Sequence, residues 1–158
     1  MAAPSADELD LGILLTAAIS VFKSRLHGHL AGAGYDDIGP SFGFVFRSLA
    51  DAPLSLAELA TRLGISSQGA LKIVSDMTER GYVERRNNPE DRRVLKVALT
   101  ARGRAALREA RRFHATTERR LVTEMGAKQV ATARAVLEAL VQQGSPDEAS
   151  WAAAARPF

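Results

Sequence analysis

The sequence predicts a mainly α-helical protein with one small β-hairpin, and three observations support this fold class. Two short segments with helical apolar spacing lie on either side of a glycine turn, within residues 55–80. Two segments of alternating polarity flank a polar loop, within residues 82–99. Longer segments with helical apolar spacing lie on both sides of this centre, at about residues 7–31 and 101–143. A chain of this length normally forms one domain, so we expect a single domain over residues 1–158.

The composition limits the class of protein. The chain has 158 residues, of which 46% are hydrophobic and 25% are charged, as in ordinary globular proteins. The absence of cysteine excludes a disulfide scaffold, a cysteine nucleophile, a thiol redox sensor and a cysteine-ligated zinc site. The longest uncharged apolar run, residues 11–22, is shorter than the roughly 20 residues that span a bilayer. No signal peptide is evident, and we expect a cytoplasmic protein with no membrane partner.

The charge of the chain is unevenly distributed. Residues 62–112 carry 13 Lys and Arg against 6 Asp and Glu, a net +7. The other residues carry 8 against 12, a net −4. A basic centre of this kind suggests a local surface that binds a polyanion such as nucleic acid. The alternative is a solvated basic face that has no partner.

The first helix is expected from about Asp7 to Ala31, after a tail of six residues. Its apolar residues cover most of its circumference, so the helix must be buried on several sides. A small domain rarely surrounds such a helix, and we expect part of its apolar surface to contact a second subunit. Glycines within residues 31–34 end the helix. A short aromatic helix then extends from Pro40 to about Leu49.

A pair of helices follows at residues 55–80. Ser55 and Glu58 have the spacing of a capping box, in which each side chain accepts the other residue's backbone N–H. Gly64 begins a tight turn, and Ser66 is placed to cap the second helix. The apolar face of this second helix is formed by Ala70, Ile73, Val74 and Met77. Two short helices joined by a three-residue turn are typical of a helix-turn-helix.

The expected hairpin comes directly after the helix pair. Its strands are Tyr82–Arg85 and Val94–Leu99, and the loop at residues 86–93 contains the Asn, Pro and Asp that favour turns. A hairpin in this position is a wing. We therefore expect residues 39–100 to form a winged helix-turn-helix lobe.

The C-terminal part is expected to be helical. Thr100 is placed to cap a long helix that ends near Met125, and Gly126 separates it from a last helix at about residues 128–143. Residues 144–158 form a tail. The long helix is expected to turn these side chains inward: Ala106, Ala110, Phe113, Leu121 and Met125.

The second helix of the pair carries side chains that suit the major groove of double-stranded DNA. Serine and glutamine near a helix N-terminus can hydrogen-bond to base edges, and an exposed leucine can contact a thymine methyl group. Lysine and the helix N-terminus can hold phosphate. The predicted contacts on this helix are Ser66, Ser67, Gln68, Leu71, Lys72 and Ser75. The alternative for each is a capped, solvated helix.

The wing supplies the rest of the predicted DNA site. Arg86, Arg92 and Arg93 lie around its tip, and arginine can read the width and potential of the minor groove. Asp91 is unfavourable beside DNA unless it orients an arginine. We therefore interpret Asp91 as a positioning residue within the wing, and a plain turn-forming aspartate is the alternative.

The sequence resembles the MarR (multiple antibiotic resistance regulator) family over about residues 7–143. The resemblance lies in the order of the elements and in four segments, LAELA at 56–60, GYVER at 81–85, DRR at 91–93 and LTARG at 99–103. Gly69 departs from the family, which usually carries threonine or a similar residue there. This departure leaves open which base pairs are read.

The resemblance implies a homodimer joined through dimerisation helices at residues 7–31 and 101–143. It implies a repressor of nearby genes that small aromatic or lipophilic molecules release from a pseudopalindromic operator. It also implies that Asp91 supports the wing and that Arg93 enters the minor groove. Effectors of the family lie between the dimer helices and the DNA-binding lobe, where the candidate residues here are Phe22, Leu26, His29, Phe42, Phe46 and Phe113. Plain hydrophobic core is the alternative for each of them.

Other classes of function find little support in the sequence. There is no P-loop, glycine-rich dinucleotide turn, HExxH motif or nucleophile elbow, so we expect no enzyme. No metal or other cofactor is expected, because His27 and His29 are two residues apart and point to different faces of a helix. A winged-helix adaptor that binds another protein instead of DNA is the remaining alternative. The basic centre argues against it, and a steep salt dependence of DNA binding would separate the two.

Overall fold

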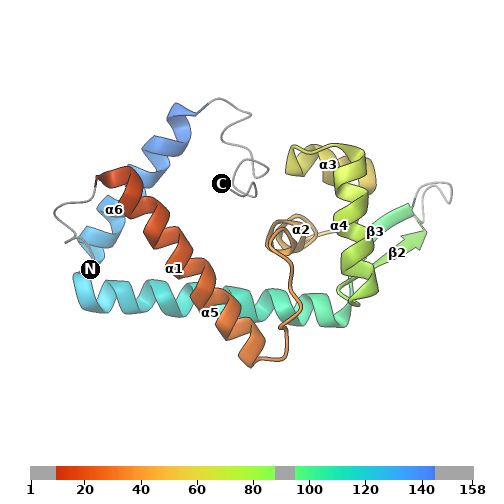
Figure 1. Ribbon diagram of the computed structural model, residues 1–158, viewed down its shortest axis with the longest axis horizontal. Helices are drawn as coiled ribbons and strands as arrows, with labels where there is room; N and C mark the ends of the chain where they lie inside the picture. Colours follow the sequence, from red (N-terminus) through yellow and green to blue (C-terminus); the bar gives the residue numbers. More distant parts are fainter. Residues whose placement is uncertain (1–9, 88–94, 145–158) are drawn as a thin grey trace, which may run out of the picture. The chain divides into compact units, whose positions relative to one another are not determined.

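The computed structural model describes residues 10–87 and 95–144 (Figure 1). Along the chain the elements are α1 (Leu11–Gly32), α2 (Phe42–Ser48), β1 (Leu54–Ser55), α3 (Leu56–Leu63), α4 (Ser67–Glu79), β2 (Val83–Asn87), β3 (Leu95–Leu99), α5 (Ala101–Met125) and α6 (Ala127–Gln143). Contacts within the chain divide it between Ile38 and Gly39 into two compact units. The structure thus confirms a mainly helical fold with a small antiparallel sheet.

The first unit consists of α1. Asp10 caps this helix, because its carboxylate accepts the backbone N–H of Ile13 at 2.9 Å. The expected start near Asp7 lies outside the described residues. Beyond the last turn, Gly34 adopts the left-handed conformation with φ +87°, in the glycine segment expected to end the helix. Large apolar side chains stay exposed on the N-terminal half of α1, namely Leu11, Ile13, Leu14, Ile19 and Val21.

The sheet of the second unit has three antiparallel strands in the order β1-β3-β2, not the two strands of the expected hairpin. β1 pairs Leu54 with Val97, and β2 pairs Val83 with Leu99. β1 was not predicted, because it has two residues and pairs with a strand about forty positions later. Arg86 was expected in the loop, whereas β2 continues to Asn87.

The helix pair forms as its sequence predicts. Ser55 N donates to Glu58 Oε2 at 2.7 Å and Glu58 N donates to Ser55 Oγ at 3.2 Å, which completes the capping box. Gly64 ends α3 in the left-handed conformation, with φ +65°. Ser66 caps α4 by accepting the N–H of Gly69 at 3.1 Å.

We expect Ser55→Ala to lower the free energy of unfolding by about 1 kcal/mol, because the mutation removes one half of the capping box. The backbone N–H and then the hydroxyl of Ser55 lower the pKa of Glu58 below its ordinary value of 4.5. Its contribution to stability is therefore complete above pH 4.5 and is lost as the pH falls through the lowered pKa. Urea denaturation at pH 7 and at pH 3 measures both effects. Because Ser55→Ala keeps the backbone N–H that binds Glu58, the role of the carboxylate is tested by Glu58→Gln, and an equal effect of that variant at the two pH values would contradict it.

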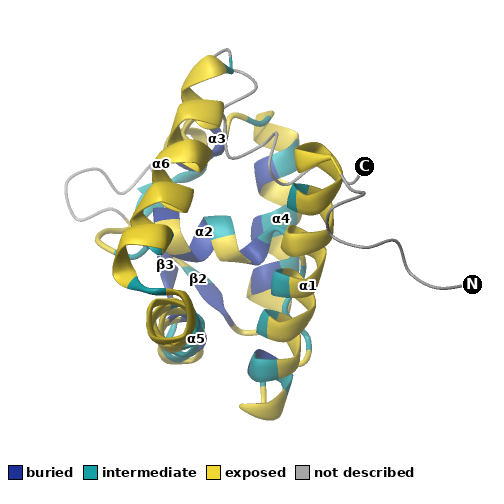
Figure 2. Cartoon of the chain, turned by 90° about the vertical axis from the view of Figure 1, so that its left-hand side faces the viewer, coloured by how far each residue is buried: buried dark blue, intermediate teal, exposed yellow. Residues whose placement is uncertain are grey.

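The core of the second unit is centred on three aromatic rings. Phe42, Phe46 and Tyr82 are at most 2% exposed and contact one another edge to face, with centroids 5.5 to 6.3 Å apart. The guanidinium groups of Arg80 and Arg102 lie over the rings of Phe42 and Tyr82, at 5.4 and 4.7 Å. Figure 2 shows the buried residues concentrated on α2, the strands and the inner face of α4.

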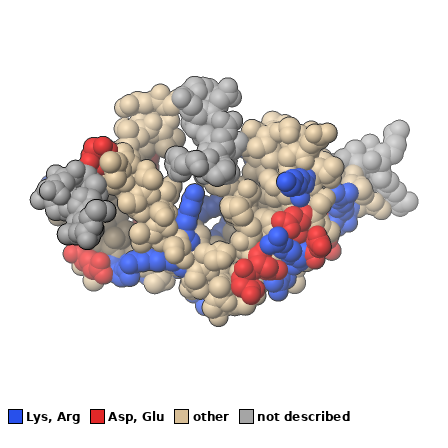
Figure 3. Space-filling model, in the orientation of Figure 1, with Lys and Arg blue, Asp and Glu red and all other residues tan. Residues whose placement is uncertain are grey.

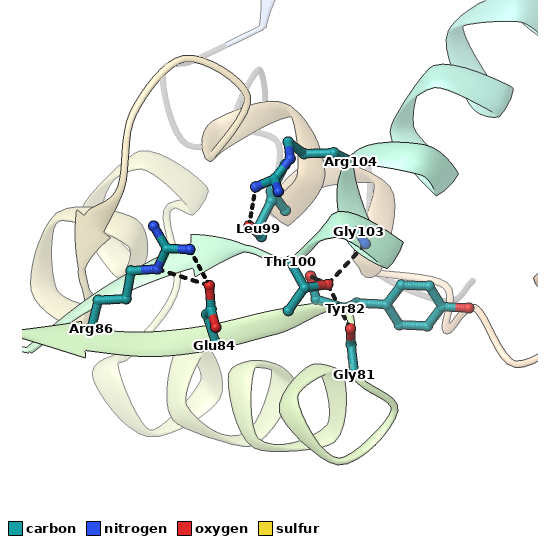
Figure 4. Close-up of polar contacts among 8 residues, drawn as sticks. All are labelled: Gly81, Tyr82, Glu84, Arg86, Leu99, Thr100, Gly103 and Arg104. Carbon is teal, nitrogen blue, oxygen red and sulfur yellow. Dashed lines mark hydrogen bonds and ion pairs between the residues drawn. The ribbon is translucent and has the colours of Figure 1, made fainter.

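Thr100 joins the sheet to α5 (Figure 4). Its hydroxyl accepts the N–H of Gly103 at 3.0 Å and lies 2.6 Å from the carbonyl oxygen of Gly81, to which it donates. Its backbone N–H donates to the carbonyl of Tyr82 at 3.0 Å. The expected cap of the long helix is therefore confirmed, and the same residue holds the end of α4, the start of β2 and the start of α5 together.

Two of the side chains expected to point inward from the long helix are exposed instead. Leu121 and Met125 are 38% and 59% exposed, whereas Ala106 is fully buried. The sequence period identified the apolar face of α5 correctly, but only its N-terminal part is covered by this chain. On α6 the apolar side chains are likewise exposed, and they include Val136, Leu137, Leu140 and Val141.

Candidate nucleic-acid interface

α4 has one buried and one exposed face. Ala70, Val74 and Met77 have no solvent exposure, and they fix the orientation of the helix in the lobe. The six side chains that the sequence analysis assigned to this helix as DNA contacts are all exposed, and they are Ser66, Ser67, Gln68, Leu71, Lys72 and Ser75. The fold therefore presents them together along the N-terminal two thirds of one helix.

The first turn of α4 combines a serine cap with a glycine. Backbone N–H groups in the first turn of a helix have no partner within it, and Ser66 satisfies only that of Gly69. A Cβ atom added at Gly69 would lie 3.3 Å from Ser66 Oγ and 3.7 Å from a methyl carbon of Ile65. Glycine at this position thus relieves crowding around the serine cap, which gives a structural reason for the departure noted in the sequence.

The charges near α4 are arranged asymmetrically. Asp76 accepts a hydrogen bond from Arg80 Nε at 2.7 Å, so its carboxylate is neutralised at the C-terminal end of the helix. Lys72 is the single charged residue in the segment 66–75, and it has no ion pair within residues 10–87 and 95–144. The exposed N-terminal part of α4 is therefore weakly positive.

The basic residues of the central region do not form one uniform face. Figure 3 shows acidic and basic side chains interspersed over the end of the molecule that carries α4 and the strands. Ion pairs such as Asp76–Arg80 and Glu84–Arg86 divide the positive charge of the central segment into smaller areas, a distribution that the net charge of +7 does not reveal.

In the wing, Arg86 is held by a neighbouring carboxylate (Figure 4). Arg86 Nε donates to Glu84 Oε1 at 2.8 Å, and its Nη2 contacts the same oxygen. Lys96 lies opposite Arg86 in the ladder, so the three charged residues share one face of the sheet. Glu84 and Lys96 were not among the predicted site residues. The pairing of Glu84 with Arg86 could have been anticipated, because residues two apart on a strand share a face. The other predicted wing residues, Asp91, Arg92 and Arg93, lie outside the described residues.

The candidate effector residues fall into two groups. Phe42 and Phe46 are part of the buried aromatic core with Tyr82, and Phe113 is half-buried beside His114 on α5. Phe22, Leu26 and His29 lie on one half-buried stripe of α1, which belongs to the other unit. Ring packing explains the burial of Phe42 and Phe46 without a ligand. A common effector site for the six residues remains a prediction.

His114 has a structural partner that the sequence did not indicate. Arg47 Nη2 donates to His114 Nε2 at 3.3 Å, which links α2 to α5. Burial, and then the nearby charge of Arg47, lower the pKa of His114 below its ordinary value of 6.5.

Within the described ranges, no group of three or more His, Asp or Glu side chains is placed to hold a metal ion. None of the helices described there combines the length and the apolarity needed to cross a bilayer.

The arrangement of α3, the turn, α4 and the β2–β3 pair defines the chain as a winged helix-turn-helix protein. Residues 44–94 match the sequence model described as MarR family. Over these residues the chain is similar to the MarR family.

Known relatives agree with this assignment. The transcriptional repressor MprA of Escherichia coli K12 is 42% identical over 53 residues, which cover 34% of this chain and 30% of MprA. The HTH-type transcriptional repressor Rv2887 of Mycobacterium tuberculosis H37Rv is 29% identical over 136 residues, which cover 85% of this chain and 96% of Rv2887. These relatives are named as transcriptional regulators and not as enzymes.

A solved structure supports the fold. FabT of Streptococcus pneumoniae, crystallised in complex with DNA, superposes with a TM-score of 0.69 at 22% identity, over 84% of this chain and 96% of FabT. At this level of identity, the likeness concerns the fold.

Proposed function

We propose that this protein is a homodimeric transcriptional repressor that binds double-stranded DNA in a sequence-specific manner. The observation that carries the proposal is the exposed face of α4, where hydrogen-bonding, apolar and cationic side chains stand together on a rigid helix. The repressors MprA and Rv2887, and the DNA complex of FabT, support the same function by similarity.

Exposed apolar surface supports the dimer. On α5 and α6 the exposed side chains include Leu121, Val122, Met125, Leu137 and Leu140. A soluble monomer rarely exposes so many large apolar side chains on adjacent elements, and a second copy would cover them. Because a two-fold dimer presents two copies of α4, we propose a pseudopalindromic operator whose half-sites are one DNA turn, about 34 Å, apart.

We further propose that a small aromatic or lipophilic effector releases the protein from its operator. The support is the family resemblance together with the half-buried apolar stripe of Phe22, Leu26 and His29 on α1 and the half-buried Phe113 on α5.

The test is a titration of the purified protein against the DNA upstream of its own gene and against a scrambled duplex, at two salt concentrations. We expect tight, salt-sensitive binding that prefers the upstream duplex, with the affinity falling steeply as phosphate contacts release counterions. Equal, weak and salt-insensitive binding to both duplexes would favour the protein–protein adaptor. A reporter gene under the same upstream DNA then separates repression from activation.

Glu84 is expected to limit the DNA affinity of the wing. It holds the guanidinium of Arg86 and places a negative charge on the surface proposed to face phosphates. Exposed ion pairs of this kind are weak, so we expect Glu84→Gln to tighten DNA binding about two- to fivefold. Fluorescence anisotropy with a fixed duplex measures the change. Glu138→Gln, an exposed glutamate on α6, is the matched control, and an unchanged affinity in Glu84→Gln would contradict this role of Glu84.

A further inference from the structure

We propose that α4 reads adjacent A·T base pairs, with Gln68 on an adenine edge and Leu71 on a thymine methyl group. The operator half-site would therefore contain two adjacent A·T pairs. This inference rests on the proposed function and specifies the DNA sequence that the same surface recognises.

Leu71 is an exposed apolar side chain on an otherwise polar helix face. Within the described part of the lobe, residues 39–87 and 95–100, the large apolar side chains classed as exposed are Leu71 and Leu95, at 41% and 49%. Leu71 lies between the polar side chains of Gln68, Lys72 and Ser75 on the solvent face of α4. In the major groove, the apolar feature of a base pair is the C5-methyl group of thymine. A leucine on this face therefore selects a pair that contains thymine.

Gln68 lies next to Leu71 on the same exposed face of α4. It is exposed one turn before Leu71, at the i, i+3 spacing that places two side chains next to each other on a helix. Its carboxamide can donate and accept at the same time, which matches N7 and N6 of adenine. Three residues of helix rise about 4.5 Å, close to the roughly 3.4 Å step between base pairs. The two side chains can therefore contact neighbouring base pairs, and both prefer an A·T base pair.

The exposed face of α4 carries few side chains that prefer a G·C pair. The segment 66–75 contains no arginine, and arginine makes the commonest specific contact with guanine. It also contains no Asp or Glu to accept a hydrogen bond from cytosine. Lys72 is its one charged side chain. A single lysine can hold a phosphate or one guanine, and the serines of this face can bond to either kind of base pair, so Lys72 is the one side chain of the segment that prefers guanine.

The experiment uses the full chain and begins with selection of bound duplexes from a randomised library. In the selected site, each thymine is then replaced in turn by uracil, which removes one methyl group and leaves the hydrogen bonds unchanged. We expect one thymine per half-site at which this replacement weakens binding about fourfold, the amount expected for one buried methyl group. In Leu71→Ala the same replacement should have no effect. Leu95→Ala is the matched control and should retain the wild-type sensitivity.

The adenine contact is tested in the same way. Replacing a neighbouring adenine by 7-deazaadenine removes the N7 acceptor and should weaken binding about tenfold in the wild type but not in Gln68→Ala. Because each ratio compares two duplexes bound by the same protein, a change in the fraction of folded variant affects both duplexes equally.

The outcomes separate the two proposals. If no duplex is enriched, sequence-specific DNA binding fails and the A·T inference fails with it. If a site is enriched but wild-type binding is insensitive to uracil, or if Leu71→Ala remains sensitive, then the A·T inference is wrong while the proposed function stands. A half-site without adjacent A·T pairs would also overturn it.

Discussion

Gly103→Ala is expected to destabilise the protein by at least about 3 kcal/mol, the upper range for overpacking a core. A Cβ atom at this position would lie 2.1 Å from the carbonyl oxygen of Tyr82 and 3.1 Å from its carbonyl carbon. The clash cannot be relieved by a side-chain rotation, because the contacted atoms are backbone. The same carbonyl oxygen also accepts the backbone N–H of Thr100 at 3.0 Å.

Chemical denaturation monitored by circular dichroism measures this effect. Gly43→Ala is the matched control, since a Cβ atom on this glycine of α2 would meet nothing within 4 Å. Alanine is the better helix former, so this control should be neutral or more stable by up to about 1 kcal/mol. If Gly103→Ala were as stable as the wild type, the close packing of α5 against Tyr82 would be disproved.

Leu137→Glu is expected to dissociate the proposed dimer and to weaken operator binding by about two orders of magnitude or more. Leu137 is 47% exposed in the single chain and lies one turn from Leu140, which is 40% exposed. A carboxylate buried in an apolar interface without a partner is strongly unfavourable. Loss of the dimer also removes the gain in affinity that comes from binding two half-sites at once, commonly 10²–10⁴-fold.

Sedimentation velocity gives the mass of the assembly, and the DNA titration gives the affinity. Gln142→Glu introduces the same side chain at an exposed polar position of α6 and should leave both unchanged. A Leu137→Glu variant that remains dimeric would place the subunit interface elsewhere. A wild-type protein that sediments as a monomer would remove the dimer from the proposed function.

Local chemistry explains why much of this fold could be predicted from the sequence. Ser55 with Glu58, and Ser66 and Thr100 with the residues three positions later, make hydrogen bonds that need no information from the rest of the chain. Gly126 separates two helices with φ +96°, a conformation that glycine adopts without strain. The exposed and buried faces of α4 follow from the helical period in the same way.

Features that depend on distant residues were not predictable from local patterns. β1 forms only because Leu54 and Ser55 meet β3, and Arg47 meets His114 across 67 positions of sequence. Helical periodicity identified the apolar face of α5, but it cannot tell whether that face is covered by the same chain or by another. For this reason Leu121 and Met125 were expected to be buried and are exposed.

The bonding of Thr100 has a mechanical consequence. The hydroxyl and the backbone N–H of Thr100 bind the carbonyl of Gly81 after α4, the carbonyl of Tyr82 before β2 and the first turn of α5. Because these bonds resist bending at the junction, we expect a rotation of α5 to carry α4 and strands β2 and β3 with it. In the proposed dimer, the distance between the two copies of α4 would then follow the tilt of the two α5 helices. A molecule that changes this tilt would alter the match to one turn of DNA without loosening either DNA-binding lobe.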